Sequence, residues 1–312
     1  MNCSYCISGY SVIKRQHSSS NINDEKMLEV IGSATFDSIS IWGGEPFYNF
    51  PKLRKTVEFC KRYYPEMPIV ITSNGTAFSP SKIKFIKEYN LNIVLSHDAD
   101  CQHYRGLDYL TDLCQLKMIK DIEKITFSTV IHNYNCDIPS IFEYFEKVSE
   151  SLKKDVGWGF ELFQLSSPET IKFLPQGKSL IKFSDSIDFL LDKFLSGHRF
   201  AISPLYKILM GMSNVIENNK SSRVRCGAYN RLTVTTNGVK AFCQVEAELG
   251  RYTYPTGQLP EGCSTCNVAK FCTGICPNIN DAYRKKMCIV YKIFYTKLYN
   301  FLINLKFNQP TL

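Results

Sequence analysis

Two groups of cysteines have the spacing of metal ligands. Cys3 and Cys6 are separated by two residues in the opening MNCSYC, and seven of the 13 cysteines fall between Cys226 and Cys288. Cysteines two to five residues apart supply two thiolates from one turn, and a tetrahedral metal or an iron–sulfur cluster needs several thiolates from neighbouring loops. The spacing predicts metal-bound thiolates, and by itself it leaves open whether the metal is structural zinc or an iron–sulfur cluster.

The C-terminal cysteines follow a defined order. It reads C-x11-G-x4-C from Cys226 to Cys243, and then C-x2-C-x5-C-x3-C and a last cysteine, Cys288. An odd number of cysteines argues against a disulfide framework, as does the lack of a signal peptide. The other four cysteines are widely spaced, and we expect them to be ordinary buried thiols: Cys60, Cys101, Cys114 and Cys136.

Composition limits the classes of protein to consider. The 312 residues are 44% apolar, which indicates a globular chain, and no apolar run reaches the roughly 18 to 20 residues of a membrane span. We therefore expect a cytoplasmic protein that does not enter a membrane. The net charge of +8 is spread along the chain, and its short basic runs at 221–226 and 283–287 lack stacking motifs for nucleic acid. We interpret these runs as solvated faces that can also offset thiolate clusters or attract an acidic peptide.

The cysteines need a scaffold, and the first two thirds of the chain predict one. Five β-rich runs alternate with amphipathic helical patterns, which is typical of parallel strands joined by right-handed helical crossovers: 38–43, 68–73, 92–97, 124–131 and 158–165. In such sheets the ligand site lies at the carboxyl ends of the strands. Polar, glycine-containing segments follow three of these strands, although each alone is also an ordinary turn former: GGEPF (43–47), SNGT (73–76) and SHDAD (96–100).

The composition changes after two more helical patterns, 177–196 and about 204–218. The remainder is short-stranded and rich in cysteine, and Asn237-Gly238 within it predicts the turn of a β-hairpin. The stretch 288–307 is apolar on most of its surface, and we favour a packed terminal helix over one lying on a membrane surface. We expect two domains, 1–200 and 201–312.

In order and spacing, these motifs resemble those of radical S-adenosylmethionine (SAM) enzymes that carry a C-terminal SPASM extension. The C-terminal cysteines and CTGICP within them resemble the SPASM pattern. CSYC resembles the end of the C-x3-C-x-aromatic-C cluster loop, GGEP the motif at the SAM amino group, and LSHDAD the strand with ribose contacts. The resemblance implies an α/β fold: a partial (β/α)6 TIM-like barrel of parallel strands lacking its first strand, followed by a small cysteine-rich α+β SPASM domain.

The resemblance also implies cofactors and their ligands. It implies a SAM-binding 4Fe-4S cluster on Cys3 and Cys6, SAM itself, and one or two auxiliary 4Fe-4S clusters. The distal auxiliary cluster would use Cys263, Cys266, Cys272 and Cys288, and the proximal one Cys226, Cys243 and Cys276. The expected cofactor-binding residues, with Arg105 near the SAM carboxylate, are Tyr5, Gly43, Gly44, Glu45, Asn74, Ser96, Asp98, Arg105 and Leu165. No catalytic residue is assigned.

The chain departs from the family pattern at three positions. The first core cysteine of the loop would stand two residues before Met1, and we expect a sequence that lacks the start of this loop rather than a lost ligand. No cysteine between Cys136 and Cys226 supplies the fourth ligand of the proximal cluster, so an open iron there could bind substrate or another ligand. Gln244 replaces the aspartate of sulfatase-maturing relatives and cannot accept a proton at neutral pH, which disfavours that reaction. Glu246 could replace it, although we interpret it as a solvated strand residue.

The function that the resemblance implies is reductive cleavage of SAM to a 5′-deoxyadenosyl radical, which takes hydrogen from a peptide or protein substrate during maturation, oxidation or cross-linking. The electron donor would be a reductant such as flavodoxin or ferredoxin. Two alternatives remain: a non-catalytic cysteine-rich protein that binds zinc or iron–sulfur clusters, and a radical SAM enzyme that acts on a small molecule.

Overall fold

The computed structural model describes residues 3–6, 21–165, 167–218, 231–243, 262–272, 279 and 281–307. Its centre is a sheet of five parallel strands in the order β1-β2-β3-β4-β5. The strands are β1 (Ile39–Ile41), β2 (Ile69–Ser73), β3 (Asn92–Ser96), β4 (Ile125–Ile131) and β5 (Gly157–Leu162). All five predicted strands are confirmed. Parallel strands that neighbour one another in chain order form the wall of a barrel, so the predicted partial-barrel fold is confirmed too.

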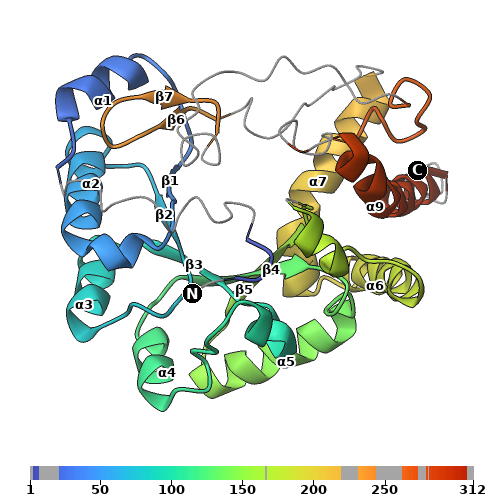
Figure 1. Cartoon of the computed structure of the whole chain (residues 1–312), viewed down its shortest axis with the longest axis horizontal. Coiled ribbons are helices and arrows are strands. Elements are labelled where there is room, and N and C mark those ends of the chain that lie inside the picture. The colour runs from blue at the N-terminus through green and yellow to red at the C-terminus, as the bar shows by residue number, and fades with distance from the viewer. Residues whose placement is uncertain are drawn as a thin grey trace.

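The helices that precede and connect the strands follow one another around the outside of this wall (Figure 1). They are α1 (Asp24–Ile31), α2 (Phe50–Tyr63), α3 (Pro80–Glu88), α4 (Leu113–Lys120) and α5 (Ile138–Leu152). Short 3-10 helices lie at strand ends and in the loop before α6: η2 (Pro46–Asn49), η3 (Ala99–Tyr104) and η4 (Pro168–Phe173). Asparagine or aspartate caps start several helices, because their side-chain oxygens accept otherwise unpaired N–H groups. Asn49 accepts from the N–H of Lys52, and Asp112 from that of Cys114.

The two faces of the sheet differ in chemistry. Side chains alternate between the faces, and those toward the helices are buried and mostly apolar, as when Phe127 of β4 stacks on Phe145 of α5. We call the opposite side the inner face. Its residues are aligned by the strand register and none of them is buried: Ser40, Val70, Thr72, Asn92, Val94, Ser96, Thr126, Ser128, Val130, Gly157, Gly159 and Glu161. A parallel sheet covered by helices on both faces would be apolar on both, so the polar inner face is suited to contact a ligand.

Three long helices follow the sheet: α6 (Lys178–Leu195), α7 (Arg199–Asn218) and α9 (Asp281–Phe307). α7 packs on β5, and α9 packs on α6 and α7. The terminal helix is therefore packed, as predicted, and residues such as Phe294 and Leu298 are buried in that contact. No helix in the described part of the chain is long and apolar enough to cross a bilayer. The boundary after residue 200 lies at the start of α7 and stays a prediction.

The predicted hairpin is present as β6 (Thr233–Val234) and β7 (Lys240–Ala241). It lies against α1 (Figure 1), and the N–H of Asn23 donates to the carbonyl of Thr236 at 2.9 Å. Gly238 in the turn has φ +73°, and a Cβ there would lie 2.2 Å from the Cβ of Lys26. Only glycine suits this position, because it must both adopt a left-handed conformation and approach the backbone of α1.

Candidate functional site

The turn that carries Cys3 and Cys6 is held against the segment that follows β3. The N–H of Ser4 donates to the carbonyl of Tyr104 at 2.9 Å, and the N–H of Cys6 donates to the carbonyl of Cys3 at 3.2 Å. Cys3 is half-buried and Cys6 is exposed. Burial raises the pKa of the Cys3 thiol, and the positive charge of Arg105 partly opposes this. The structure therefore brings the two predicted cluster ligands to the carboxyl end of the sheet, close to Arg105.

Tyr5, between these cysteines, is inserted into an aromatic cage. Its ring centroid lies 5.1 Å from those of His132 and Phe173 and 6.3 Å from that of Phe163. The guanidinium of Arg105 lies over the ring of Tyr5, 5.5 Å from its centroid. The side chain is 5% exposed, and its hydroxyl has no hydrogen-bond partner among the described residues. A buried tyrosine hydroxyl is normally paired, so this one points to a missing polar group.

Asp98 joins this cage from the end of β3. Its Oδ1 accepts from the N–H of Val130 and lies 3.0 Å from Nε of Arg105, and its Oδ2 lies 3.6 Å from Nε2 of His132. Nδ1 of His132 accepts from the N–H of Tyr134, so the neutral ring carries its proton on Nε2, toward Asp98. Burial by itself would lower the pKa of Arg105. The negative charges of Asp98 and Cys3 have the larger effect, so the pKa of Arg105 is raised.

Three buried polar atoms of this cluster have no hydrogen bond within the described residues: Tyr5 Oη, Asp98 Oδ2 and His132 Nε2. These three residues are at most 5% exposed. Buried polar atoms almost always have partners, and a group of orphans beside an open sheet face is a reason to expect a polar ligand. Asp98 and Arg105, predicted as separate SAM contacts, are thus one ion pair at the head of the inner face.

A second pair fixes the loop that carries them. Nε2 of His97 donates to Oδ1 of Asp108 at 3.0 Å, and Nδ1 of His97 accepts from the N–H of Ala99. Burial lowers the pKa of His97. The pKa of Asp108 is also lowered, because its hydrogen bond with His97 outweighs its own burial. Both ends of the loop between Asp98 and Asp108 are therefore tied to one buried imidazole.

The GGEP segment forms a second part of the strand-end region. Gly43 and Gly44 have φ of 120° and 34°, conformations that favour glycine. Glu45 accepts from Ser73 Oγ at 2.8 Å and from the N–H of Asn74 at 2.6 Å, and so links the ends of β1 and β2. Burial raises the pKa of Glu45, and these hydrogen bonds oppose the rise. The structure brings Glu45 and Asn74 together, and their contact with SAM stays a prediction.

Two other predicted cofactor residues, Ser96 and Leu165, contact residues other than those of the aromatic cage. Ser96 is half-buried on the inner face, and its carbonyl accepts from the hydroxyl of Tyr109 at 3.3 Å. Leu165 is fully buried, and its N–H lies 3.1 Å from the sulfur of Met287 on α9. The main chain at Leu165 is thus turned toward the terminal helix.

The auxiliary-cluster ligands are only partly within the described residues. Cys226 and Cys276 lie outside them, as do Gln244 and Glu246. Burial and nearby thiols raise the pKa of Cys263 and of Cys288, so Cys263, Cys266 and Cys288 are near one another. In the part of the chain that the structure describes, no three Cys, His, Asp or Glu side chains are arranged to hold a metal ion. Both auxiliary ligand sets therefore stay predictions.

The prediction of four ordinary buried thiols holds for two of them. Cys60 is buried, which raises its pKa to about 11, and Cys136 is buried as well. The prediction is wrong for Cys114, which is exposed in the first turn of α4. Cys101 is half-buried and donates from Sγ to the carbonyl of Tyr134 at 3.2 Å.

Sequence reasoning missed His132, Phe163 and Phe173. His132 directly follows β4, so the rule that chemistry lies at strand ends would have found it. Phe163 directly follows β5, so the same rule would have found it. Phe173 lies at the end of η4, and its place beside Tyr5 depends on a loop whose path the sequence does not predict.

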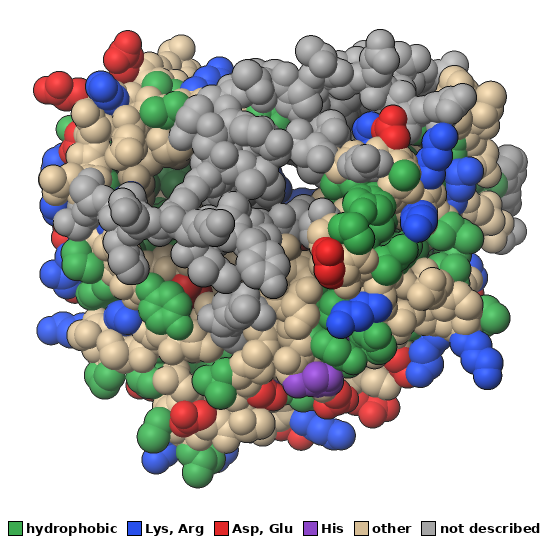
Figure 2. Space-filling model, viewed as in Figure 1, with side chains coloured by type: hydrophobic (Ala, Val, Ile, Leu, Met, Phe, Trp, Pro, Cys, Tyr) green, Lys and Arg blue, Asp and Glu red, His purple; other side chains and the backbone are tan. Residues whose placement is uncertain are grey.

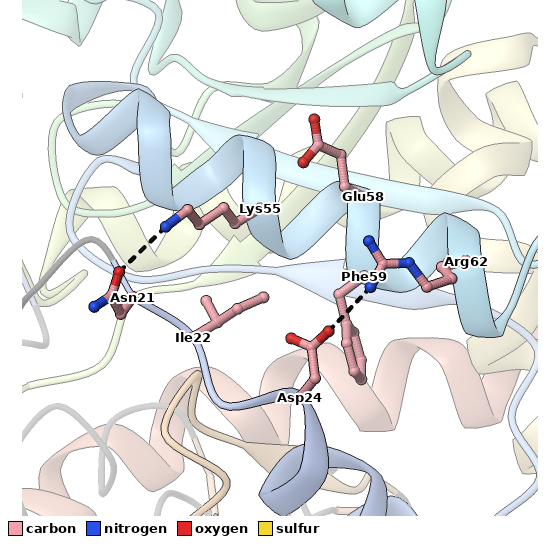
Figure 3. Close-up of a pocket in the computed structure, with 7 residues that line it drawn as sticks. All are labelled: Asn21, Ile22, Asp24, Lys55, Glu58, Phe59 and Arg62. Carbon is pink, nitrogen blue, oxygen red and sulfur yellow. Dashed lines mark hydrogen bonds and ion pairs between the residues drawn. The ribbon is translucent and has the colours of Figure 1, made fainter.

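Hollows elsewhere on the surface do not involve this cluster. One of about 240 Å³ lies between α2 and the segment that leads into α1 (Figure 3), where Arg62 pairs with Asp24 and Lys55 with Asn21. Another, of about 570 Å³, lies between α6 and α9. On the face seen in Figure 2, lysine and arginine side chains are interrupted by acidic, apolar and uncharged ones. That distribution suits the expectation of no nucleic-acid partner, which stays a prediction.

Comparisons with known proteins agree with this geometry. Residues 1–102 match the family model of the radical SAM superfamily. No curated protein matches the chain significantly. Among solved structures, native anSMEcpe with bound AdoMet and Kp18Cys peptide is similar at a TM-score of 0.69 and 20% identity, over 99% of this chain and 96% of that one. Native anSMEcpe with bound AdoMet is similar at a TM-score of 0.67 and 20% identity, over 98% and 95%.

These findings confirm the resemblance that the motifs indicate. The sequence match covers the Cys3–Cys6 turn, GGEP and Asp98, while the structural match extends over nearly the whole chain and concerns the fold. Residues 1–102 therefore resemble a radical SAM domain, and the chain as a whole has the fold of the anSMEcpe structures.

Proposed function

We propose that this protein is a radical SAM enzyme that takes a hydrogen atom from a peptide or protein substrate. The observation that carries the proposal is the position of the Cys3–Cys6 turn. Its main chain is bonded to Tyr104, and Tyr5 between the cysteines packs beside the ion pair of Asp98 and Arg105. Thiolates and unpaired polar groups thus meet at the carboxyl end of an open parallel sheet, where such folds bind ligands.

The residues present fit the implied cofactors in part. Cys3 and Cys6 would supply two thiolates of a cluster that needs three protein ligands to leave one iron open for SAM. The third ligand stays unassigned, since no other cysteine belongs to that turn. When bound together, the cluster and SAM supply one-electron cleavage of the sulfonium and removal of hydrogen from the substrate.

The chain's own residues would bind and shield SAM. Arg105 keeps its positive charge because Asp98 is beside it, so it can attract the carboxylate of SAM. The hydroxyl of Tyr5 and Nε2 of His132 offer further polar contacts. The aromatic rings around Tyr5 exclude water from this end of the sheet, which strengthens electrostatic contacts there.

The proposed substrate class rests on the open inner face and on the comparisons. Solved anSMEcpe structures contain AdoMet together with Kp18Cys or Cp18Cys peptide, and their fold is shared here. A peptide seated on the inner face would lie next to the SAM site. Auxiliary clusters on the C-terminal cysteines and an acidic electron carrier such as flavodoxin or ferredoxin belong to the same proposal.

The test is anaerobic reconstitution with iron and sulfide, followed by metal analysis and an assay for 5′-deoxyadenosine with dithionite and SAM. Wild type should bind iron and form 5′-deoxyadenosine. The double variant Cys3→Ala/Cys6→Ala should lose SAM cleavage, and Cys114→Ala, an exposed cysteine outside the site, should retain it.

Equilibrium binding of SAM gives a second readout. Arg105→Leu should weaken SAM binding while Arg199→Leu, which removes a surface arginine, should leave it unchanged. Bound zinc without iron, together with intact SAM, would instead support a structural cysteine-rich protein.

A further inference from the structure

The inner face is a polar surface with a defined layout. The strand register places Ser96, Ser128 and Gly159 in one row, and Val130 beside Glu161 in the next row toward the carboxyl ends. Most of the neighbouring inner-face side chains are small. Helices that pack on a sheet need apolar side chains to contact, so this face is suited to a polar substrate instead.

Two glycines of β5 lie on this face, and they differ in the room that they leave. A Cβ at Gly157 would lie 2.6 Å from Oγ1 of Thr126, so that site is narrow. A Cβ at Gly159 would have no atom of the described residues within 4 Å, so these residues leave space above it. A gap at a strand glycine often marks close approach by a ligand or another backbone.

Glu161 stands at the edge of this space. It is the one carboxylate among the inner-face residues, it is exposed, and it has no hydrogen bond or ion pair within the described part of the chain. It lies two residues before Phe163, whose ring contacts Tyr5. Residues two apart on a strand are roughly 7 Å apart on one face, so this carboxylate lies near the proposed SAM site.

The charge of Glu161 is unusual in its surroundings. The cationic group of Arg105 nearby is already neutralised by Asp98, and the inner-face neighbours are uncharged. The chain as a whole carries +8, and several other acidic side chains pair with a cation on the outer surface, as Asp24 does with Arg62 and Asp137 with Lys182. An unpaired carboxylate on a polar face attracts a cation and disfavours an anion.

We propose that Glu161 selects a cationic side chain, such as the ammonium of a lysine, in the substrate held over the inner face, with the aliphatic stem lying over Gly159. This proposal rests on the proposed function for its peptide substrate. The carboxylate would form a charge-assisted hydrogen bond with the substrate and would set which residue can lie beside the reacting position. Glu161 is thus a specificity residue rather than a catalytic one.

The test uses three fluorescein-labelled pentapeptides that differ only at the centre, with lysine, norleucine or glutamate between alanines and terminal glycines. Binding to the reconstituted protein with SAM is measured by fluorescence anisotropy. Wild type should bind the lysine peptide about tenfold more tightly than the norleucine peptide, as one charge-assisted contact allows. Glu161→Gln should bind both equally, and Glu161→Lys should prefer the glutamate peptide.

The matched control is Glu143→Gln, which removes the same charge from the exposed side of α5 and should keep the lysine preference. A measurement on wild type alone guards against misfolded variants: the lysine peptide should reduce carbodiimide-coupled amine labelling of Glu161, detected by mass spectrometry. Equal binding of all peptides by wild type, no measurable binding of any, or a lysine preference that survives Glu161→Gln would overturn the proposal.

Formation of 5′-deoxyadenosine separates this proposal from the function on which it rests. Cleavage of SAM by wild type and Glu161→Gln alike, without a lysine preference, rejects the role of Glu161 alone. A lysine preference in a protein that leaves SAM intact rejects the enzyme and retains the binding site.

Discussion

Nε of Arg105 lies 3.0 Å from Oδ1 of Asp98, and both side chains are almost fully buried at the carboxyl end of the sheet. Six residues of loop separate them from one another in sequence, and the η3 turn brings them together beside Cys3. A charge buried here persists only while its partner is present. Because the same pair borders the proposed SAM site, it affects both stability and binding.

Removing one partner of this pair should be costly. Asp98→Asn leaves the Arg105 guanidinium buried without a counter-ion, and we expect the free energy of unfolding to fall by about 3–5 kcal/mol. Urea denaturation followed by circular dichroism measures the change. The control is Asp155→Asn, which breaks a solvent-exposed pair with Arg199 and should cost less than about 1 kcal/mol. Equal losses in the two variants would contradict the assignment.

The buried His97 should make stability depend on pH in a defined window. Its pKa is lowered in the folded protein, so on acidification the unfolded chain takes up this proton first, near the ordinary value of about 6.5. The contribution of His97 is therefore complete above that pH and is lost as the pH falls toward the lower folded pKa. Unfolding free energies of wild type should decline between pH 7 and pH 5.

His97→Asn supplies the reference for that measurement, because it removes the group and its share of the decline. Asp108 contributes in a different window: its folded pKa is lowered, so its share is present above about pH 3.9 and is lost below it. A wild-type curve that is flat or rising from pH 7 to pH 5, relative to His97→Asn, would show that the imidazole is not buried in its neutral form.

The hairpin should detach from α1 if its turn acquires a side chain. Gly238→Ala would place Cβ 2.2 Å from Cβ of Lys26 and 2.6 Å from its carbonyl carbon, in addition to the strain of a positive φ. We expect a loss of at least about 2 kcal/mol and faster amide hydrogen exchange at Asn23, whose N–H binds the hairpin.

Gly197→Ala is the matched control for Gly238. Its φ is +76°, and a Cβ there would have no atom within 4 Å, so only the left-handed strain of about 1 kcal/mol applies. Exchange at Asn23 should stay at the wild-type rate in this variant. The docking model fails if the two alanine variants lose the same stability.

Lys154 should be the lysine whose loss matters most for α4. Its Nζ donates to the carbonyls of Ile119, Lys120 and Ile122 at the end of that helix, and its pKa is lowered by burial. Lys154→Met removes these charge-assisted bonds and should lower the free energy of unfolding by about 2–3 kcal/mol. Lys153→Gly, next to it, should instead stabilise the protein by about 1 kcal/mol, because Lys153 has φ +54°.

Local pattern predicted the scaffold well, because strand and helix periodicity is written in neighbouring residues. The runs around Ile71, Leu95 and Phe127 became strands at the expected places, and Asn237-Gly238 became a turn. Alternation of residues predicts a strand, but it does not tell which face of the sheet packs on helices. The position of Glu161 on a polar inner face therefore became clear only from the strand register. Likewise Cys60 and Cys114 both lie in helical segments, and only the packing of those helices makes Cys60 buried and Cys114 exposed.

By itself the sequence determined the five strands, the motifs at their ends that resemble those of radical SAM enzymes, and the cysteines available as ligands, since these can be read from short-range spacing. Only the tertiary structure decided that Asp98 pairs with Arg105, that His132, Phe163 and Phe173 surround Tyr5, and that Glu161 lies exposed beside Val130 on the inner face. The physical reason is that these contacts join residues from different strand ends, whose separation depends on strand register and loop path rather than on any local preference.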